Sequence, residues 1–268
     1  MRLGFLQMEP RFGAVQDNVA AIEQALARTR DATIVLPELC TTGYVFESRA
    51  EALELAEAAD GPSLQALKVL ARRNRLVLCA GFAEKSGRHV YNSAATLLPS
   101  GRVHVYRKAH LFDREKLIFD AAPARFEVIP GAVRYGMMVC FDWFFPEACR
   151  SLALAGADVI LHPANLVLPY CQSAMITRCL ENRVFAVTCN RIGTERRAGV
   201  TLRFTGASQI VDCRGQVLAR ASDDRLELQV VTVDAMQARD KHVTARNDLF
   251  ADRRPAAYGR LTAKLPRR

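Results

Sequence analysis

Cys140 is a candidate nucleophile because of the residues on either side of it. Met137–Val139 is an apolar, strand-like run, and Pro146 stands in the first turn of the helical pattern that follows. The thiol is therefore expected at the carboxyl edge of a strand, just before a helix amino terminus whose partial positive charge favours the thiolate. A buried structural cysteine is the plainer interpretation of this residue taken alone.

Two further strand ends carry a carboxylate and an ammonium group. Glu38 directly follows Thr33–Pro37, an apolar run typical of a strand covered on both faces. Lys108 follows the strand-like run Val103–Arg107 in a chain that has six lysines among its 37 lysine and arginine residues. A lysine amine has a tunable pKa, whereas arginine keeps its proton. Taken alone, Glu38 is equally well interpreted as a solvated glutamate, and a surface position is the usual one for a lysine such as Lys108. Open α/β sheets, however, place their chemistry at this edge.

The composition excludes several classes of protein. Half of the 268 residues are hydrophobic and 24% are charged, which excludes disordered and fibrous chains. No apolar run approaches the ~20 residues that span a bilayer, so no membrane partner is expected. Met1–Met8 is typical of a first strand and lacks the features of a signal peptide, which favours a cytoplasmic protein.

Neither the cysteines nor the basic residues indicate a metal or a nucleic-acid partner. Eight cysteines are scattered without a CxxC pair, which favours reduced thiols. His162, Cys171 and Cys179 come nearest to a ligand set, but their spacing matches no structural zinc pattern. From Arg239 onward, nine Lys/Arg and three Asp/Glu contribute +6 of the net charge of +9. No nucleic-acid motif accompanies this charge, which favours a solvated tail or a subunit contact.

Strand and helix patterns alternate along the chain, which favours one α/β domain over residues 1–250, followed by a basic tail, residues 251–268. The predicted strands are Leu3–Met8, Thr33–Pro37, Leu76–Gly81, Tyr91–Leu98, Val103–Arg107, Phe126–Ile129, Met137–Val139, Asp158–Leu161, Val184–Cys189, Phe204–Val211, Gln216–Ala219 and Leu226–Val233. The predicted helices are Val15–Arg30, Glu51–Ala59, Ser63–Asn74, 146–153, Gln172–Asn182 and Ala235–Arg246, the first with Asp17 or Asn18 as its cap.

The surroundings of the three strand ends resemble the nitrilase superfamily of carbon–nitrogen hydrolases. The resemblance rests on Leu36-Pro37-Glu38 with Gly43-Tyr44, on Arg107-Lys108-Ala109-His110-Leu111-Phe112, and on Cys140-Phe141-Asp142 with Phe145-Pro146-Glu147. Later segments are also similar: Glu181-Asn182-Arg183, Asn190-Arg191-Ile192-Gly193, Phe204-Thr205-Gly206-Ala207-Ser208 and Arg253-Arg254-Pro255. Each motif is short, but three in this order at such separations form a specific signal.

The resemblance implies a fold, an assembly and a catalytic triad. The implied fold is a four-layer αββα sandwich that associates into homodimers or larger homo-oligomers, with contacts expected from the helices after Cys140 and from the C-terminal segment. The implied triad is Glu38, Lys108 and Cys140, and Glu115 matches a second glutamate of the family. The loop Phe119–Pro123 departs from the family's glycine-containing turn, so the shape of the pocket lip stays open.

Such a triad implies hydrolysis of a small-molecule amide. Cys140 attacks the carbonyl, Glu38 shuttles the proton, and Lys108 with the Phe141 N–H binds the oxyanion, without metal or organic cofactor. Tyr44, Phe141, Trp143 and Asn165 are the candidate substrate-binding residues, with Phe144 as a further apolar neighbour.

The sequence leaves alternatives open for both the substrate and the activity. Members that hydrolyse nitriles usually have Trp-Glu after the cysteine, whereas this chain has Phe141-Asp142, which favours an amidase over a nitrilase. An N-carbamoyl compound is the nearest rival substrate. From another class, the chain could be a non-catalytic binding or regulatory member of the fold. A redox sensor is less favoured, since the cysteine nearest to Cys140 is Cys149.

Overall fold

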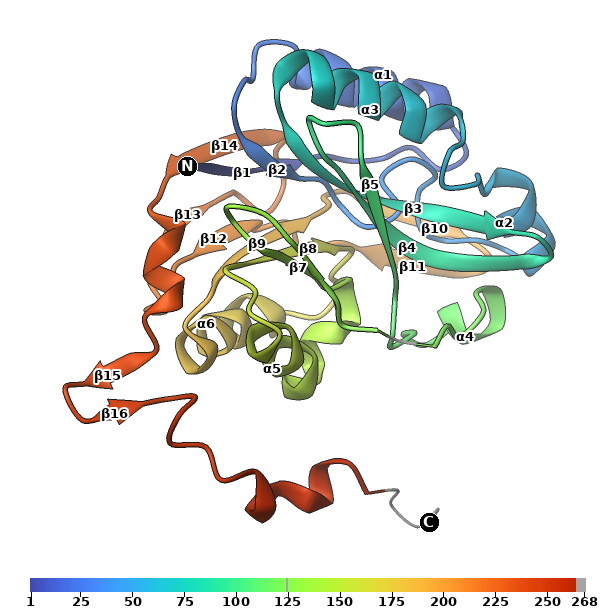
Figure 1. The fold of residues 1–268 in the computed structure, drawn as a ribbon. Coiled ribbons are helices and arrows are strands. Elements are labelled where there is room, and N and C mark those ends of the chain that lie inside the picture. Colours follow the sequence, from blue (N-terminus) through green and yellow to red (C-terminus); the bar gives the residue numbers. More distant parts are fainter. Residues whose placement is uncertain (124, 264–268) are drawn as a thin grey trace.

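Two six-stranded sheets form the centre of the computed structural model, which describes residues 1–123 and 125–263 (Figure 1). The first sheet has the order β14 (Glu227–Thr232), β1 (Arg2–Gln7), β2 (Thr33–Val35), β3 (Val77–Ser86), β4 (His89–Leu97) and β5 (Val103–Arg107). The second has the order β13 (Val217–Arg220), β12 (Gln209–Val211), β9 (Phe185–Asn190), β8 (Val159–Ala164), β7 (Tyr135–Met137) and β6 (Val128–Ile129).

Each sheet has a parallel centre and antiparallel edges. β1, β2 and β3 run parallel in one sheet, and β7, β8 and β9 run parallel in the other. Strands of this kind are covered on both faces, which explains why they read as continuous apolar runs in the sequence. The two sheets pack face to face through a shared core that includes Phe5 and Val35 from the first sheet and Leu161 and Val187 from the second.

Helices cover the outer face of each sheet, as Figure 1 shows, so the predicted four-layer αββα sandwich is confirmed. α1 (Val15–Ala25) and α3 (Pro62–Asn74) lie over the first sheet, and Ile22, Leu67 and Ile34 belong to the core between them. α5 (Pro146–Leu154) and α6 (Cys171–Asn182) lie over the second sheet. Two shorter helices, α2 (Arg49–Leu55) and α4 (Glu115–Ile118), and the hairpin of β10 (Thr194–Arg197) and β11 (Val200–Arg203) complete the fold.

Several local predictions were wrong; α2, for example, ends at Leu55, four residues before the predicted Ala59. α1 ends at Ala25, not Arg30, and is preceded by Ala14 without a side-chain cap. The strand predicted over Phe204–Val211 is interrupted, because Gly206 and Ala207 both have positive φ. The helix predicted over Ala235–Arg246 is only a 3₁₀ turn, Ala235–Arg239, after which β15 (His242–Thr244) pairs with β16 (Asn247–Asp248). The β-branched Val243 and Thr244 favour this extended conformation.

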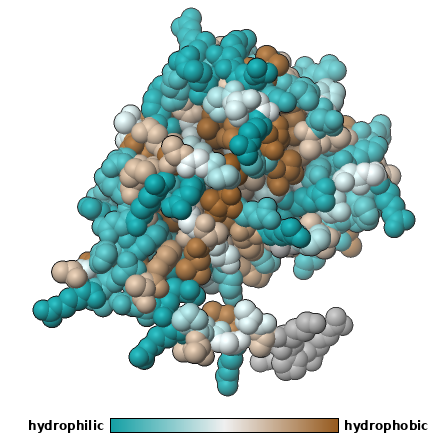
Figure 2. Space-filling view, viewed as in Figure 1, coloured by the Kyte–Doolittle hydropathy of each residue, from teal (hydrophilic) through white to brown (hydrophobic). Residues whose placement is uncertain are grey.

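The C-terminal segment leaves the sandwich and stands apart from it (Figures 1 and 2). Its last element is a 3₁₀ helix over Pro255–Leu261 in which no residue is buried. Phe250 contacts the sandwich: the Arg150 guanidinium lies 5.5 Å and the Lys241 ammonium 4.8 Å from the centre of the Phe250 ring. Residues 264–268 of the predicted tail lie outside the described residues. Among the described helices, none combines the length and apolar character needed to cross a bilayer.

Candidate active site

Glu38 lies at the end of β2, pressed against the neighbouring strand. A Cβ built on Gly81 of β3 would stand 2.5 Å from the Glu38 Cα, so only glycine permits this approach. The side chain of Glu38 is fully buried. Its Oε1 accepts a hydrogen bond from Asn92 Nδ2 at 2.7 Å, while its Oε2 has no partner among the described residues. One carboxylate oxygen is therefore held and the other is left for chemistry.

Lys108 joins two carboxylates in a buried cluster. It follows β5, and its backbone N–H donates to the Asn92 carbonyl at 2.8 Å, which fixes the residue against β4. Its Nζ donates to Glu38 Oε1 at 2.7 Å and to Glu115 Oε1 at 2.8 Å. The predicted acid, cation and second glutamate thus come together although they arise from separate elements.

Glu115 is held in turn by Tyr44. The Tyr44 hydroxyl donates to Glu115 Oε1 at 2.7 Å, and the Phe112 N–H donates to Oε2 at 3.2 Å. Burial raises the pKa of Tyr44 well above its usual value, so its hydroxyl keeps the proton that it donates. Burial also raises the pKa of Glu115, against the opposing effect of the Lys108 charge.

Cys140 begins a 3₁₀ helix, Cys140–Phe144, in an unusual backbone conformation. Its φ is +41°, in the left-handed region that residues other than glycine rarely adopt. His162 Nε2 donates to the Cys140 carbonyl at 2.9 Å, and its Nδ1 lies 3.1 Å from Thr188 Oγ1. Because a carbonyl can only accept, His162 is the Nε2–H tautomer, and burial lowers its pKa and keeps it neutral. Asn165 lines the same cavity as Cys140.

The expected thiolate is not what this site favours. Burial raises the pKa of Cys140 well above its ordinary value, and the Glu38 charge raises it further, while the Lys108 charge lowers it. The helix amino terminus invoked from the sequence belongs to α5, which begins only at Pro146. Burial lowers the pKa of Lys108, but the charges of Glu115 and Glu38 outweigh this and raise it overall. The free site therefore holds a thiol beside a firmly protonated ammonium.

The cavity beside the thiol is small and mainly apolar. It measures about 20 Å³, which is room for about one water molecule. Three of the predicted pocket residues line it, and the full lining is Phe112, Cys140, Phe141, Trp143, Asn165, Leu166, Val167 and Leu168. Tyr44 instead lines a separate cavity of about 80 Å³ together with Glu115 and Phe112. Phe144 does not line the catalytic cavity and is half exposed.

Two residues of the site were missed in the sequence. Asn92 binds Glu38 and the Lys108 backbone, and His162, whose contact with Cys140 was not predicted, binds the Cys140 carbonyl. Asn92 is a polar residue inside the strand β4, and such a buried position was the available signal. No sequence pattern predicts their partners, because Glu38 lies 54 residues from Asn92 and Cys140 lies 22 residues from His162.

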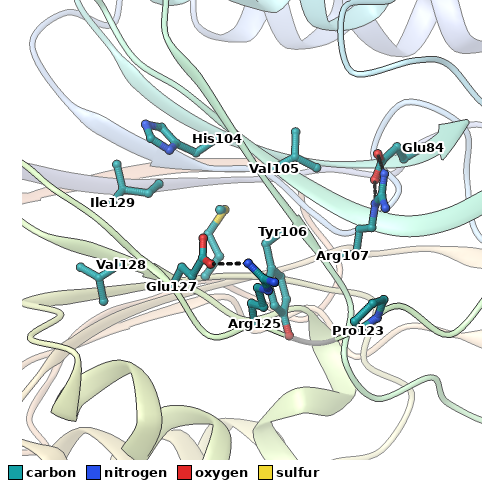
Figure 3. Close-up of a pocket in the computed structure, with 11 residues that line it drawn as sticks. Glu84, His104, Val105, Tyr106, Arg107, Pro123, Arg125, Glu127, Val128 and Ile129 are labelled. Atoms are coloured by element: carbon teal, nitrogen blue, oxygen red, sulfur yellow. Dashed lines mark hydrogen bonds and ion pairs between the residues drawn. The ribbon is translucent and has the colours of Figure 1, made fainter. Parts of the chain in front are cut away.

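A larger groove lies elsewhere, between the edge strands β5 and β6 (Figure 3). It measures about 330 Å³ but contains none of the triad residues. Its charged side chains pair with one another: Arg107 lies 2.6 Å from Glu84 and Arg125 lies 3.8 Å from Glu127. Tyr106 forms part of its wall and donates to Asp142 at 2.8 Å. Among the described residues that line it, the groove therefore has neither a nucleophile nor an unpaired charge.

Comparisons with known proteins give one consistent result. A family model described as carbon-nitrogen hydrolase matches residues 2–242. A protein of Pyrococcus abyssi named nitrilase is 42% identical over 97% of this chain and 100% of its own. An (R)-stereoselective amidase of Pseudomonas sp. is 32% identical over 98% and 94%. The crystal structure of a carbon-nitrogen hydrolase from Helicobacter pylori G27 superposes with a TM-score of 0.87 at 26% identity, covering 98% of each chain.

Proposed function

The chain belongs to the carbon–nitrogen hydrolase family, and from that premise we propose that it hydrolyses a small aliphatic amide to a carboxylic acid and ammonia. The observation that carries this proposal is the buried ammonium of Lys108, held between Glu38 and Glu115, whose charges all act on the Cys140 thiol. A nucleophile, a proton acceptor and a fixed positive charge are the groups that acyl transfer requires.

The first half of the reaction forms a thioester. The Cys140 sulfur bonds to the amide carbon while its proton passes to the unpartnered Oε2 of Glu38. Two of the three Lys108 N–H groups are bound by carboxylates, so the third is available, with the Phe141 N–H, for the oxyanion. The carbon–nitrogen bond then breaks as Glu38 gives its proton to the nitrogen, and ammonia leaves.

The second half returns the enzyme to its starting state. Glu38 accepts a proton from water as the water oxygen attacks the thioester carbon. The carbon–sulfur bond breaks, the sulfur regains a proton from Glu38, and the acid is released. Because burial raises the pKa of Cys140, proton transfer accompanies attack and no standing thiolate is needed.

Nitrile hydrolysis on the same residues is the second candidate. It is favoured by the 42% identity to a protein named nitrilase. Against it stands Phe141-Asp142, where nitrile-hydrolysing members usually have Trp-Glu.

We also propose that the protein is cytoplasmic. This proposal is supported by its eight cysteines, which are all free thiols, as is usual in a reducing compartment.

Ammonia release from matched compounds tests these functions. Butyramide, butyronitrile and an N-carbamoyl amine are compared at equal concentrations, with Cys140→Ala as the control for the nucleophile. We expect the amide to be hydrolysed fastest and the Cys140→Ala protein to be inactive while folded by circular dichroism. Faster release from the nitrile or the carbamoyl compound would replace the amidase proposal by that activity. Undiminished turnover by Cys140→Ala would remove Cys140 from its role.

A further inference from the structure

Asn165 places an unpaired amide inside the catalytic cavity. The residue is 2% exposed, and neither its Nδ2 nor its Oδ1 has a hydrogen-bond partner among the described residues. Asn165 lines the same small cavity as Cys140, so its side chain belongs to the immediate surroundings of the reacting atom. Leaving a buried amide unpaired is unfavourable, and native proteins keep few such groups. The arrangement is explained if the substrate supplies the missing partners.

The rest of the cavity cannot replace this amide. The other lining side chains are apolar except for the Cys140 thiol and the indole N–H of Trp143. The reacting carboxamide has its own partners in the proposed chemistry. Lys108 and the Phe141 N–H bind its oxygen, and Glu38 gives a proton to its nitrogen. Asn165 is therefore free to bind the acyl part of the substrate, next to the carbon that bonds to sulfur.

We propose that Asn165 selects acyl groups that carry a hydroxyl on the carbon adjacent to the scissile carbonyl, so that small 2-hydroxy amides are the preferred substrates. This inference rests on the hydrolysis proposed above. A hydroxyl donates to Oδ1 and accepts from Nδ2 at once, whereas a carboxylate satisfies only Nδ2 and an ammonium only Oδ1.

Binding to the inactive Cys140→Ala protein tests the selection without turnover. Lactamide and isobutyramide differ only by a hydroxyl in place of a methyl group, and both are titrated calorimetrically. We expect lactamide to bind at least tenfold more tightly, because a site built to bind a hydroxyl rejects the analogue that lacks it. In Cys140→Ala/Asn165→Leu this preference should disappear or reverse. Equal binding of the two amides to Cys140→Ala, as when a bound water satisfies Asn165, would overturn the inference.

Two further measurements distinguish hydroxyl selection by Asn165 from the proposed hydrolysis and from a purely structural role of this residue. If the wild-type protein hydrolyses both amides at equal kcat/KM, the hydroxyl selection fails while the proposed hydrolysis stands. If lactamide is preferred in binding but no ammonia is released, the hydrolysis fails and the selection stands. Asn165→Leu should leave Tm unchanged or raise it, since it removes an unpaired buried amide of similar size. A fall in Tm would show a structural role for the amide and contradict the selection.

Discussion

At the scale of single residues, the site depends on which atoms are held and which are left free. Glu38 Oε1 accepts from both Lys108 and Asn92, so the carboxylate cannot turn, and Oε2 keeps one fixed direction. Cys140 is fixed by a hydrogen bond from His162 to its carbonyl, which supports a left-handed backbone that costs about 1–3 kcal/mol. The reactive groups are thus positioned by neighbours that take no part in the proposed chemistry.

Asn92→Leu tests this positioning at Glu38. Loss of the amide frees Oε1 from one of its two donors, so the carboxylate can rotate away from the thiol. We expect kcat to fall about 10- to 100-fold with little change in KM, since displacement of a catalytic group by 1 Å has a cost of this order. Ser93→Ala is the control, because the adjacent Ser93 binds Glu84 instead of the site. An equal loss in both variants would indicate general damage to β4.

The raised pKa of Cys140 gives a second residue-scale prediction. Alkylation requires the thiolate, whose fraction rises with pH as long as the pH stays below the pKa. Because the pKa of Cys140 lies well above its ordinary value, the rate of alkylation by iodoacetamide should rise about tenfold per pH unit from pH 6 to 9 without a plateau. Peptide mapping by mass spectrometry gives the rate at Cys140 itself. A plateau below pH 8 would show a stable thiolate and support the helix-terminus effect expected from the sequence.

At the scale of elements, a buried ion pair between Glu195 of β10 and Arg191, which directly follows β9, holds the turn that carries Tyr44. Glu195 accepts from the backbone N–H of Tyr44 at 3.1 Å and of Val45 at 2.7 Å, and its carboxylate is paired with Arg191, which is 1% exposed. The Arg191 guanidinium also lies 4.1 Å from the centre of the Phe204 ring. Since Tyr44 binds Glu115 and Glu115 binds Lys108, this pair supports the cluster from a distance.

Glu195→Gln should therefore affect both stability and activity. Removing one partner of a buried pair leaves the other charge uncompensated and costs about 3–5 kcal/mol, measurable by urea unfolding. Activity should fall as well, because glutamine keeps only one accepting oxygen and the backbone N–H groups of Tyr44 and Val45 lose part of their anchor. Glu47→Gln is the matched control: Glu47 lies 3.6 Å from Arg197 of the same strand but is largely exposed, so its loss should cost less than about 1 kcal/mol. Equal costs for the two variants would contradict this role.

The elements also show what a sequence reveals and what it hides. The parallel strands were predicted because burial on both faces leaves an apolar run, and β2 and β8 lie where these runs stand. Glu38, Lys108 and Cys140, the residues of the proposed triad, were recognisable because each follows such a run or belongs to a motif that resembles the family. Local conformation was harder: the left-handed turn at Cys140 and the missing helix after Arg239 depend on contacts that periodicity does not encode. Asn92 and His162 were hidden because their partners come from other elements.

At the scale of the whole molecule, the C-terminal segment and the outer helices expose apolar side chains. Tyr258 and Leu261 are 39% and 64% exposed on a segment that stands apart from the sandwich (Figure 1). Leu154 of α5 and Leu180 of α6 are likewise 42% and 51% exposed. We propose that residues 1–250 fold as one domain and that the segment after them, with the outer faces of α5 and α6, forms contacts within a homo-oligomer.

A chain ending at Phe250 tests this assembly. It keeps the ring that packs between Arg150 and Lys241, so the sandwich should remain folded, while the oligomer should dissociate. Sedimentation equilibrium measures the mass, and circular dichroism checks the fold. The full-length Tyr258→Ser/Leu261→Ser variant is the control for apolar contact, and it should weaken association without removing the basic residues. An unchanged mass in both would place the interface on α5 and α6 alone.

The net charge of the cluster formed by Glu38, Lys108 and Glu115 affects how readily the acid produced in the proposed reaction is released. Lys108 contributes one positive charge between two carboxyl groups, so the cavity holds no surplus cation with which to retain an anion. A carboxamide arrives neutral, whereas the acid that leaves it ionises at neutral pH. In the proposed hydrolysis, the two carboxyl groups therefore favour release of the acid, and added product acid should inhibit the reaction only weakly.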